Sequence, residues 1–194
     1  MKNSEWSLDI GSEINLLSQA FAFLEEKGGS LSPYVATWGD AGRVVVALLT
    51  ALLKRRGKLV YYEPGCGEAK VAGRVAEDAS YTLCIELDES LAEKAWSTVK
   101  DHAADVVVAD LAYFEPRRAD VVYTYLLPKA IQIVINNLSN QNAIIVSLDY
   151  PSPGYAPLEV ARIKVGEREI YIYYTFSVKA KPAAGGGQQG LETP

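Results

Sequence analysis

The chain has 194 residues, of which 49% are hydrophobic and 22% are charged, and its net charge at neutral pH is −5. This composition is typical of a soluble globular domain with one sizeable core. The negative charge argues against a broad nucleic-acid interface, and the apolar runs are too short to cross a bilayer.

The residues that build metal centres and hydrolytic triads are scarce. Cys66, Cys84 and the single His102 are too few for a zinc site, a disulfide framework or Ser-His-Asp chemistry, so no metal is expected. The N-terminus lacks the basic start and apolar stretch of a secretory signal. We therefore expect a cytoplasmic monomer with no membrane partner.

Two helices are predicted in the first part of the chain. Apolar residues recur at helical spacing over 12–26, and the glycines at 28–29 end that helix. Pro33 favours an extended segment. A second helix is predicted to start after Thr37 and to run to about residue 56.

Strand and helix patterns then alternate along the chain. Strands are predicted at 59–63, 81–86, 106–110, 120–125 and 142–149, and helices at 68–77, 89–101 and 128–138. Two further strands, 158–165 and 169–178, are joined by the short link Gly166-Glu167-Arg168 as a hairpin. This order predicts an α/β fold with a Rossmann-like doubly wound sheet, mostly parallel, that ends in an antiparallel hairpin. We expect a helical extension over 1–30, one domain over 31–178 and a disordered tail over 179–194.

A glycine-rich turn follows the first strand of this sheet and reads Glu63-Pro64-Gly65-Cys66-Gly67. Ligands of doubly wound sheets bind at the carboxyl ends of strands, where glycines let the backbone approach them closely. A dinucleotide site needs a third glycine where this chain has Lys70, and no phosphate-binding G-x-x-x-x-G-K-[ST] run occurs. For the loop alone, a plain strand-to-helix turn remains the alternative.

Two further acids extend the pattern. Glu86 ends the second predicted strand, 19 residues after Gly67, where an acid can accept the ribose hydroxyls of a nucleoside. Asp110 ends the third, where an acid can accept from an adenine amino group. A carboxylate at Glu63 could face the ammonium of a methionine moiety. Together the three acids favour S-adenosylmethionine (SAM) as the cofactor.

These segments resemble motif I (63–69), the acidic loop (84–88) and the next motif (108–111) of the seven-strand, class I SAM-dependent methyltransferases. Three more segments are similar to one branch, the archaeal protein lysine methyltransferases of broad specificity. The first is Pro33-Tyr34-Val35-Ala36-Thr37, which in the family lies over the cofactor, and the second is Tyr123-Thr124-Tyr125-Leu126-Leu127. The third is Val146-Ser147-Leu148-Asp149-Tyr150, followed by Gly154-Tyr155-Ala156-Pro157. The chain departs from the family at Glu63 (usually Asp), at Ala69 (usually Gly), and at Ala36 and Trp38 (usually Pro).

The resemblance implies methyl transfer from SAM to the lysine side chains of protein substrates, with no nucleic-acid partner. The cofactor-binding residues implied are Tyr34, Thr37, Glu63, Gly65, Cys66, Gly67, Glu86, Leu87, Asp110 and Leu111. The catalytic residues implied are Tyr125, Asp149 and Tyr150, which with Tyr34 would line an aromatic acceptor channel. Alternatively, Tyr125 and Tyr150 only cap the sheet.

Two other functions remain open. A methyltransferase acting on RNA or a small molecule is disfavoured because Tyr125-Leu126-Leu127-Pro128 replaces the Asn/Asp-Pro-Pro-aromatic motif that holds planar amino groups. The altered motif I supports a different hypothesis, in which the chain is a SAM-binding paralogue without activity that has a regulatory or scaffolding role.

Overall fold

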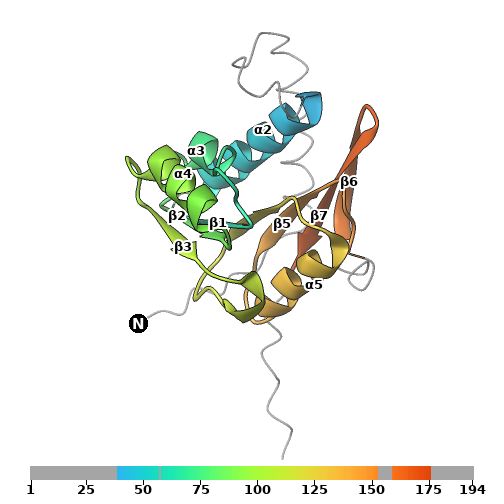
Figure 1. Cartoon of the computed structure of the whole chain (residues 1–194). Helices are drawn as coiled ribbons and strands as arrows, with labels where there is room; N and C mark the ends of the chain where they lie inside the picture. Colours follow the sequence, from blue (N-terminus) through green and yellow to red (C-terminus); the bar gives the residue numbers. More distant parts are fainter. Residues whose placement is uncertain (1–38, 57, 153–158, 176–194) are drawn as a thin grey trace, which may run out of the picture.

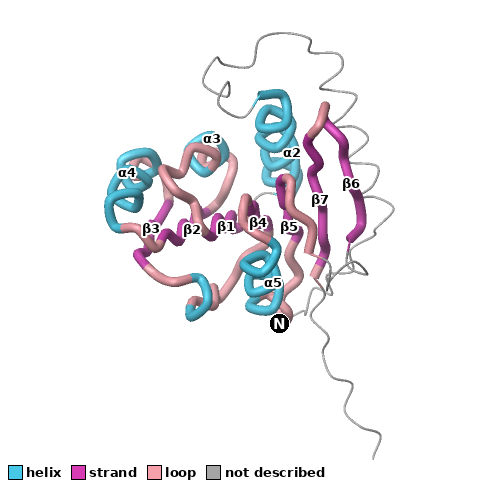
Figure 2. Tube along the Cα trace, turned by 45° about the vertical axis from the view of Figure 1, so that its right-hand side comes forward, coloured by secondary structure: helices cyan, strands magenta, loops and turns pink. Residues whose placement is uncertain are grey.

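The computed structural model describes residues 39–56, 58–152 and 159–175 of the chain. In this part, seven strands form one mixed sheet with helices on both faces (Figures 1 and 2). The predicted N-terminal helix, the segment with Tyr34 and Thr37, the run 153–158 and the predicted tail lie outside the described residues.

The sheet has the strand order β3-β2-β1-β4-β5-β7-β6. Its strands are β1 (Val60–Pro64), β2 (Tyr81–Glu86), β3 (Ala104–Val108), β4 (Val121–Thr124), β5 (Ile144–Leu148), β6 (Glu159–Val165) and β7 (Arg168–Tyr174). The first five strands are parallel, and β7 runs antiparallel between β5 and β6. The order reverses between β1 and β4, so a ligand crevice is expected at their carboxyl ends. The predicted fold class is confirmed.

The helices cover the two faces unequally. They are α2 (Gly39–Arg56), α3 (Ala72–Val75), α4 (Glu89–Val99), α5 (Pro128–Asn137) and the short 3-10 turn η2 (Leu111–Tyr113). Figure 2 shows α2, α3 and α4 on one face of the sheet and α5 on the other. Asp88 begins α4 as its N-cap, since its side chain accepts hydrogen bonds from the backbone N–H groups of Ser90 and Leu91.

Two predicted elements differ from the structure. The helix expected at 68–77 is reduced to α3, because Gly67 and Ala69 have φ of 57° and 54° and an α-helix requires negative φ. The third strand ends at Val108 and not at Asp110, because its register follows β2, where Glu86 pairs with Val108. Asp110 therefore lies two residues beyond the strand.

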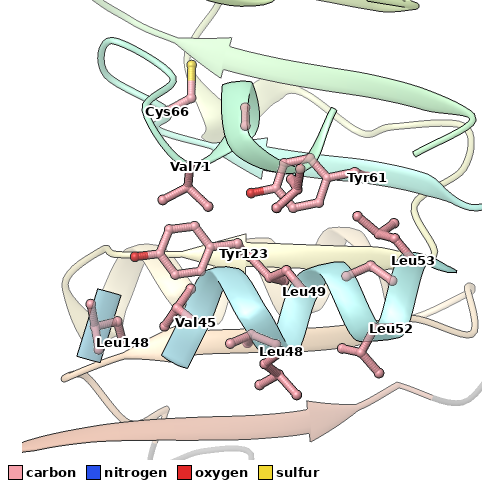
Figure 3. Close-up of a cluster of buried hydrophobic side chains, with 14 of the residues drawn as sticks. Val45, Leu48, Leu49, Leu52, Leu53, Tyr61, Cys66, Val71, Tyr123 and Leu148 are labelled. Atoms are coloured by element: carbon pink, nitrogen blue, oxygen red, sulfur yellow. The ribbon is translucent and has the colours of Figure 1, made fainter. Parts of the chain in front are cut away.

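Alternating side chains of the central strands bury both faces of the sheet. Tyr61 and Tyr123 point to the α2 side and pack with Leu49 and Leu53 of that helix (Figure 3). The other face packs against α5, and its buried members include Tyr62, Val122, Ile145, Tyr173, Ile131 and Ile135. With both faces covered, the carboxyl edge of the parallel strands is where the sheet can meet a ligand.

Candidate functional site

The loop after β1 is held against its neighbours by the backbone. The N–H groups of Gly65 and Cys66 both donate to the carbonyl oxygen of Ile85 in β2, at 2.7 and 3.1 Å. Gly65 has φ of 67°, and a Cβ built there would lie 2.7 Å from Cδ2 of Leu126. The left-handed conformation favours glycine at this position, and the lack of a Cβ lets the Leu126 side chain pack closely against it.

Ala69 stands where the related loops have a third glycine, and it is fully buried. Its φ of 54° is left-handed, as glycine would allow freely. An alanine in this region carries about 1–2 kcal/mol of strain. The loop therefore keeps its left-handed turn in spite of the substitution, with the strain supported by the surrounding packing.

Glu63 is a buried carboxyl group beneath this loop, only 4% exposed. The hydroxyl of Tyr61 donates a hydrogen bond to its Oε2 at 2.7 Å. Burial raises the pKa of Glu63 to about 8, while the bonds from Tyr61 and from the backbone N–H of Ala72 act to lower it. The group therefore holds its proton at neutral pH until a cation replaces the lost solvation.

A cleft of about 330 Å³ opens at this point between the loop, the first turn of α4 and the end of β4. Its lining residues are Glu63, Pro64, Gly65, Cys66, Gly67, Glu68, Lys70, Leu91, Tyr123 and Tyr125. The structure thus brings four of the predicted cofactor residues together with Tyr125 from the predicted acceptor side. Two lining residues had no predicted role: Leu91 lies outside every predicted motif, and Tyr123 belongs to the segment 123–127, in which only Tyr125 was assigned to the site.

Glu86 connects the loop to the next turn. Its Oε2 accepts from the N–H of Gly67 at 2.8 Å, and its Oε1 accepts from the N–H groups of Leu87 and Asp88 at 2.8 and 3.1 Å. Leu87 itself is 67% exposed beside it. Neither residue lines the cleft, but both lie at the carboxyl end of β2, and Glu86 is hydrogen-bonded to the glycine loop.

Asp110 and Leu111 lie farther along this edge, also outside the cleft. The carboxylate of Asp110 accepts a hydrogen bond from the N–H of Ala112 and begins η2. The N–H of Ala109 donates to the carbonyl oxygen of Glu86 at 3.0 Å, which links the two turns. Leu111 packs against the cluster on the α5 side. Asp110 is thus exposed and next to the turn that Glu86 organises.

The three predicted acceptor residues meet around an arginine. The rings of Tyr125 and Tyr150 are 5.9 Å apart between centroids. Asp149 has φ of 63° and forms a bidentate ion pair with Arg168. Sequence analysis missed Arg168; the available signal was its place directly after the hairpin turn, where antiparallel pairing returns the chain to the end of β5.

The two cysteines, Cys66 in the loop and Cys84 in β2, are both buried and free. A hydrogen bond with the Cys66 thiol, and then burial, raise the pKa of Cys84 well above its ordinary value, so Cys84 stays a thiol at neutral pH. Within the described ranges, no three His, Cys, Asp or Glu side chains come together in a way that could hold a metal ion. Among the helices described, none has the length and apolar character for a bilayer crossing.

No protein-family model matches the chain, and no curated protein is similar to it in sequence. Solved structures do resemble it. An RNA methyltransferase from Salinibacter ruber, in complex with S-adenosyl-L-homocysteine, is 24% identical with a TM-score of 0.59, over 67% of this chain and 89% of that one. The N-methyltransferase NodS from Bradyrhizobium japonicum WM9, in complex with the same compound, is 13% identical with a TM-score of 0.55, over 80% and 98%. The chain has the seven-strand methyltransferase fold.

Proposed function

We propose that this protein is a SAM-dependent methyltransferase. The observation that supports this best is the glycine loop of β1 joined by a hydrogen bond to the carboxylate that ends β2, beside a cleft at the switch point of the sheet. Two enzymes of the same fold were crystallised with S-adenosyl-L-homocysteine, which is SAM without its methyl group. The left-handed φ of Ala69 keeps the turn that a third glycine would give, which supports SAM binding by this loop.

Each part of SAM has a proposed partner on the carboxyl edge. The methionine ammonium would meet Glu63 at the base of the cleft, where the attraction is strong because water is largely excluded. The ribose would bind at Glu86 and the adenine beside Leu87, Asp110 and Leu111. Because a carboxylate has about four acceptor sites and Glu86 uses three for backbone N–H groups, one ribose hydroxyl can bind without rearrangement.

Methyl transfer from a sulfonium is an in-line displacement with a good leaving group. The protein supplies alignment and exclusion of water and needs no acid–base pair for the displacement itself. The acceptor would approach from the end of β4, where Tyr123 and Tyr125 line the cleft. The methyl group then forms a bond to the acceptor atom as its bond to sulfur breaks.

For the acceptor, we propose lysine side chains of proteins. A lysine must lose its proton before it attacks, and its ordinary pKa near 10.4 makes the neutral form rare at pH 7. The aromatic pair of Tyr125 and Tyr150, with Asp149 already neutralised by Arg168, is a setting of low net charge that favours the neutral amine. Tyr34 belongs to the same acceptor proposal, and Tyr34 and Thr37 belong to the proposed cofactor site, although both lie outside the described residues.

RNA is the second candidate acceptor, because the Salinibacter ruber enzyme of the same fold is an RNA methyltransferase. Calorimetry first measures SAM binding by the full chain, and labelled SAM is then incubated with cell protein and with total RNA separately. Label in protein supports the lysine proposal, and label in RNA alone favours the second candidate. Absence of SAM binding at millimolar concentration would refute both.

A further inference from the structure

Arg168 and Asp149 form a fork-shaped ion pair where β5 ends and β7 begins. Nε of Arg168 donates to both Oδ1 and Oδ2 of Asp149 at 3.0 Å, and Nη2 donates to Oδ2. The N–H of Asp149 donates to the carbonyl oxygen of Glu169 at 2.7 Å, so the backbones are joined as well. The side chains are 29% and 24% exposed, so water screens the pair only in part.

The same guanidinium also contacts the wall of the cleft. Its Cζ lies 5.4 Å from the centroid of the Tyr125 ring. The Tyr125 ring also contacts the ring of Tyr150. Such a cation–π contact orients a ring that is otherwise 46% exposed. Tyr125 lines the cleft, whereas Arg168 and Asp149 do not. Arg168 therefore lies behind the aromatic side chain that an acceptor would touch.

The charges of the pair reach the cleft and oppose each other there. The pKa of Tyr123 is raised by burial first and then by Glu63; Arg168 acts to lower it, and Asp149 acts to raise it. The other charged or titratable groups that line the cleft include Tyr125, directly after β4, and Glu68 with its partner Lys70. An acceptor amine beside Tyr125 would thus experience little net charge from the Asp149–Arg168 pair.

We propose that Arg168 is a positioning residue of the acceptor site: it holds the Tyr125 ring at the cleft and balances the charge of Asp149, so that a lysine amine enters unprotonated. This inference rests on the proposed function and deepens it. Arg168 acts through its two neighbours and does not touch the reacting atoms.

Arg168→Met removes both effects, and different kinetic parameters report each of them. The unbalanced Asp149 carboxylate would attract a lysine ammonium, so KM for a protein substrate should fall a few-fold. The same carboxylate raises the pKa of the bound amine, which moves the pH–rate curve upward by about half to one pH unit. A freer Tyr125 ring aligns the acceptor less well, and kcat should fall by roughly ten- to a hundredfold. SAM affinity should stay within about twofold, since Arg168 lies outside the cofactor residues.

Arg162 offers a matched control on the same hairpin. It forms a forked pair with Glu159 at 3.0 and 3.3 Å, and its Cζ lies 4.8 Å from the Tyr171 ring centroid. None of these three residues lines the cleft. Arg162→Met therefore removes the same kinds of contact away from the acceptor side and should keep the wild-type kinetics and pH profile.

Arg168→Lys is the conservative variant. It retains the positive charge, so the pH–rate curve should stay in place. It cannot make the planar fork or cover the ring as a guanidinium does, so kcat should fall by less than in Arg168→Met. Because the charge is kept, this variant also tests the idea if Arg168→Met folds poorly.

The measurement is initial-rate methyl transfer from labelled SAM to the best-labelled protein of the cell mixture, from pH 6.5 to 10, with calorimetry of SAM for every variant. A lower KM, a lower kcat and an upward pH shift in Arg168→Met, absent in Arg162→Met, support the inference. Equal kcat, KM and pH profile in wild type and Arg168→Met would overturn it and leave the proposed function standing. No methyl transfer by the wild-type chain to protein would overturn both the lysine proposal and this inference.

Discussion

Glu63 offers the sharpest test of the site, because its burial predicts how stability changes with pH. Its pKa is raised from the ordinary 4.5 to about 8, first because burial disfavours the charged form. Between these two values the folded chain keeps the proton, whereas the unfolded chain releases it. The folded state binds more protons in this window, so the free energy of unfolding falls as pH rises from about 4.5 to about 8 and then levels off.

The size of this effect follows from the shift itself. One pH unit corresponds to about 1.4 kcal/mol, so the full window is worth at most about 4–5 kcal/mol. Glu63→Gln keeps a side-chain oxygen that can accept from Tyr61 but cannot ionise. The variant and the wild type should be similarly stable near pH 5, where both side chains are neutral, and the variant should be more stable by several kcal/mol at pH 8.5.

The assay is urea unfolding at half-unit steps from pH 5 to 8.5. Other titrating groups contribute equally to both proteins, so the difference between the two curves isolates Glu63. Glu77→Gln, at an exposed acid in the turn after α3, serves as the control and should run parallel to the wild type. Parallel curves for Glu63→Gln would show that Glu63 is ionised in the folded state and that the electrostatic account of the cleft is wrong.

Four further outcomes are expected. SAM binding at pH 7 should release close to one proton from Glu63, which calorimetry in buffers of different ionisation enthalpy measures; no buffer dependence would remove Glu63 as the ammonium partner. Glu86→Ala should weaken SAM binding by about 1–3 kcal/mol and also lower stability, since three backbone N–H groups lose their acceptor; unchanged affinity by calorimetry in a folded variant would reject the ribose assignment. Gly65→Val should abolish binding while the domain still folds, because a β-branched residue strains the left-handed φ of 67° and would change the shape of the cleft that Gly65 lines; thermal protection by SAM in that variant would place the cofactor elsewhere. Tyr125→Ala should lower the rate of methyl transfer far more than the affinity for SAM, and the wild-type rate should rise with pH. Tight SAM binding by the wild-type chain with no methyl transfer from pH 7 to 10 would refute the enzyme proposal.

Most of the fold could be predicted from local patterns of residues along the chain. Buried parallel strands are short apolar runs bounded by turns, and the second strand was predicted at 81–86 with the bounds that the structure has. The tight turn of the loop was predicted from its glycines, because glycine adopts left-handed backbone conformations without strain, and Gly65 and Gly67 have φ of 67° and 57°. These features depend on neighbours a few residues apart, which the sequence lists directly.

Only the tertiary structure showed the hydrogen-bond and ion-pair partners of the polar groups in the site. Arg168 reaches Asp149 because β7 turns back beside β5, and no spacing between these two residues predicts a bidentate pair. Glu86 was expected at a strand end, but its three backbone partners come from two separate loops. The raised pKa of Glu63 likewise comes from burial beneath a loop, which outweighs the opposite effect of the hydrogen bond from Tyr61. Secondary structure follows from short-range periodicity, whereas charge balance and proton affinity depend on which distant side chains and how much water surround a group after folding.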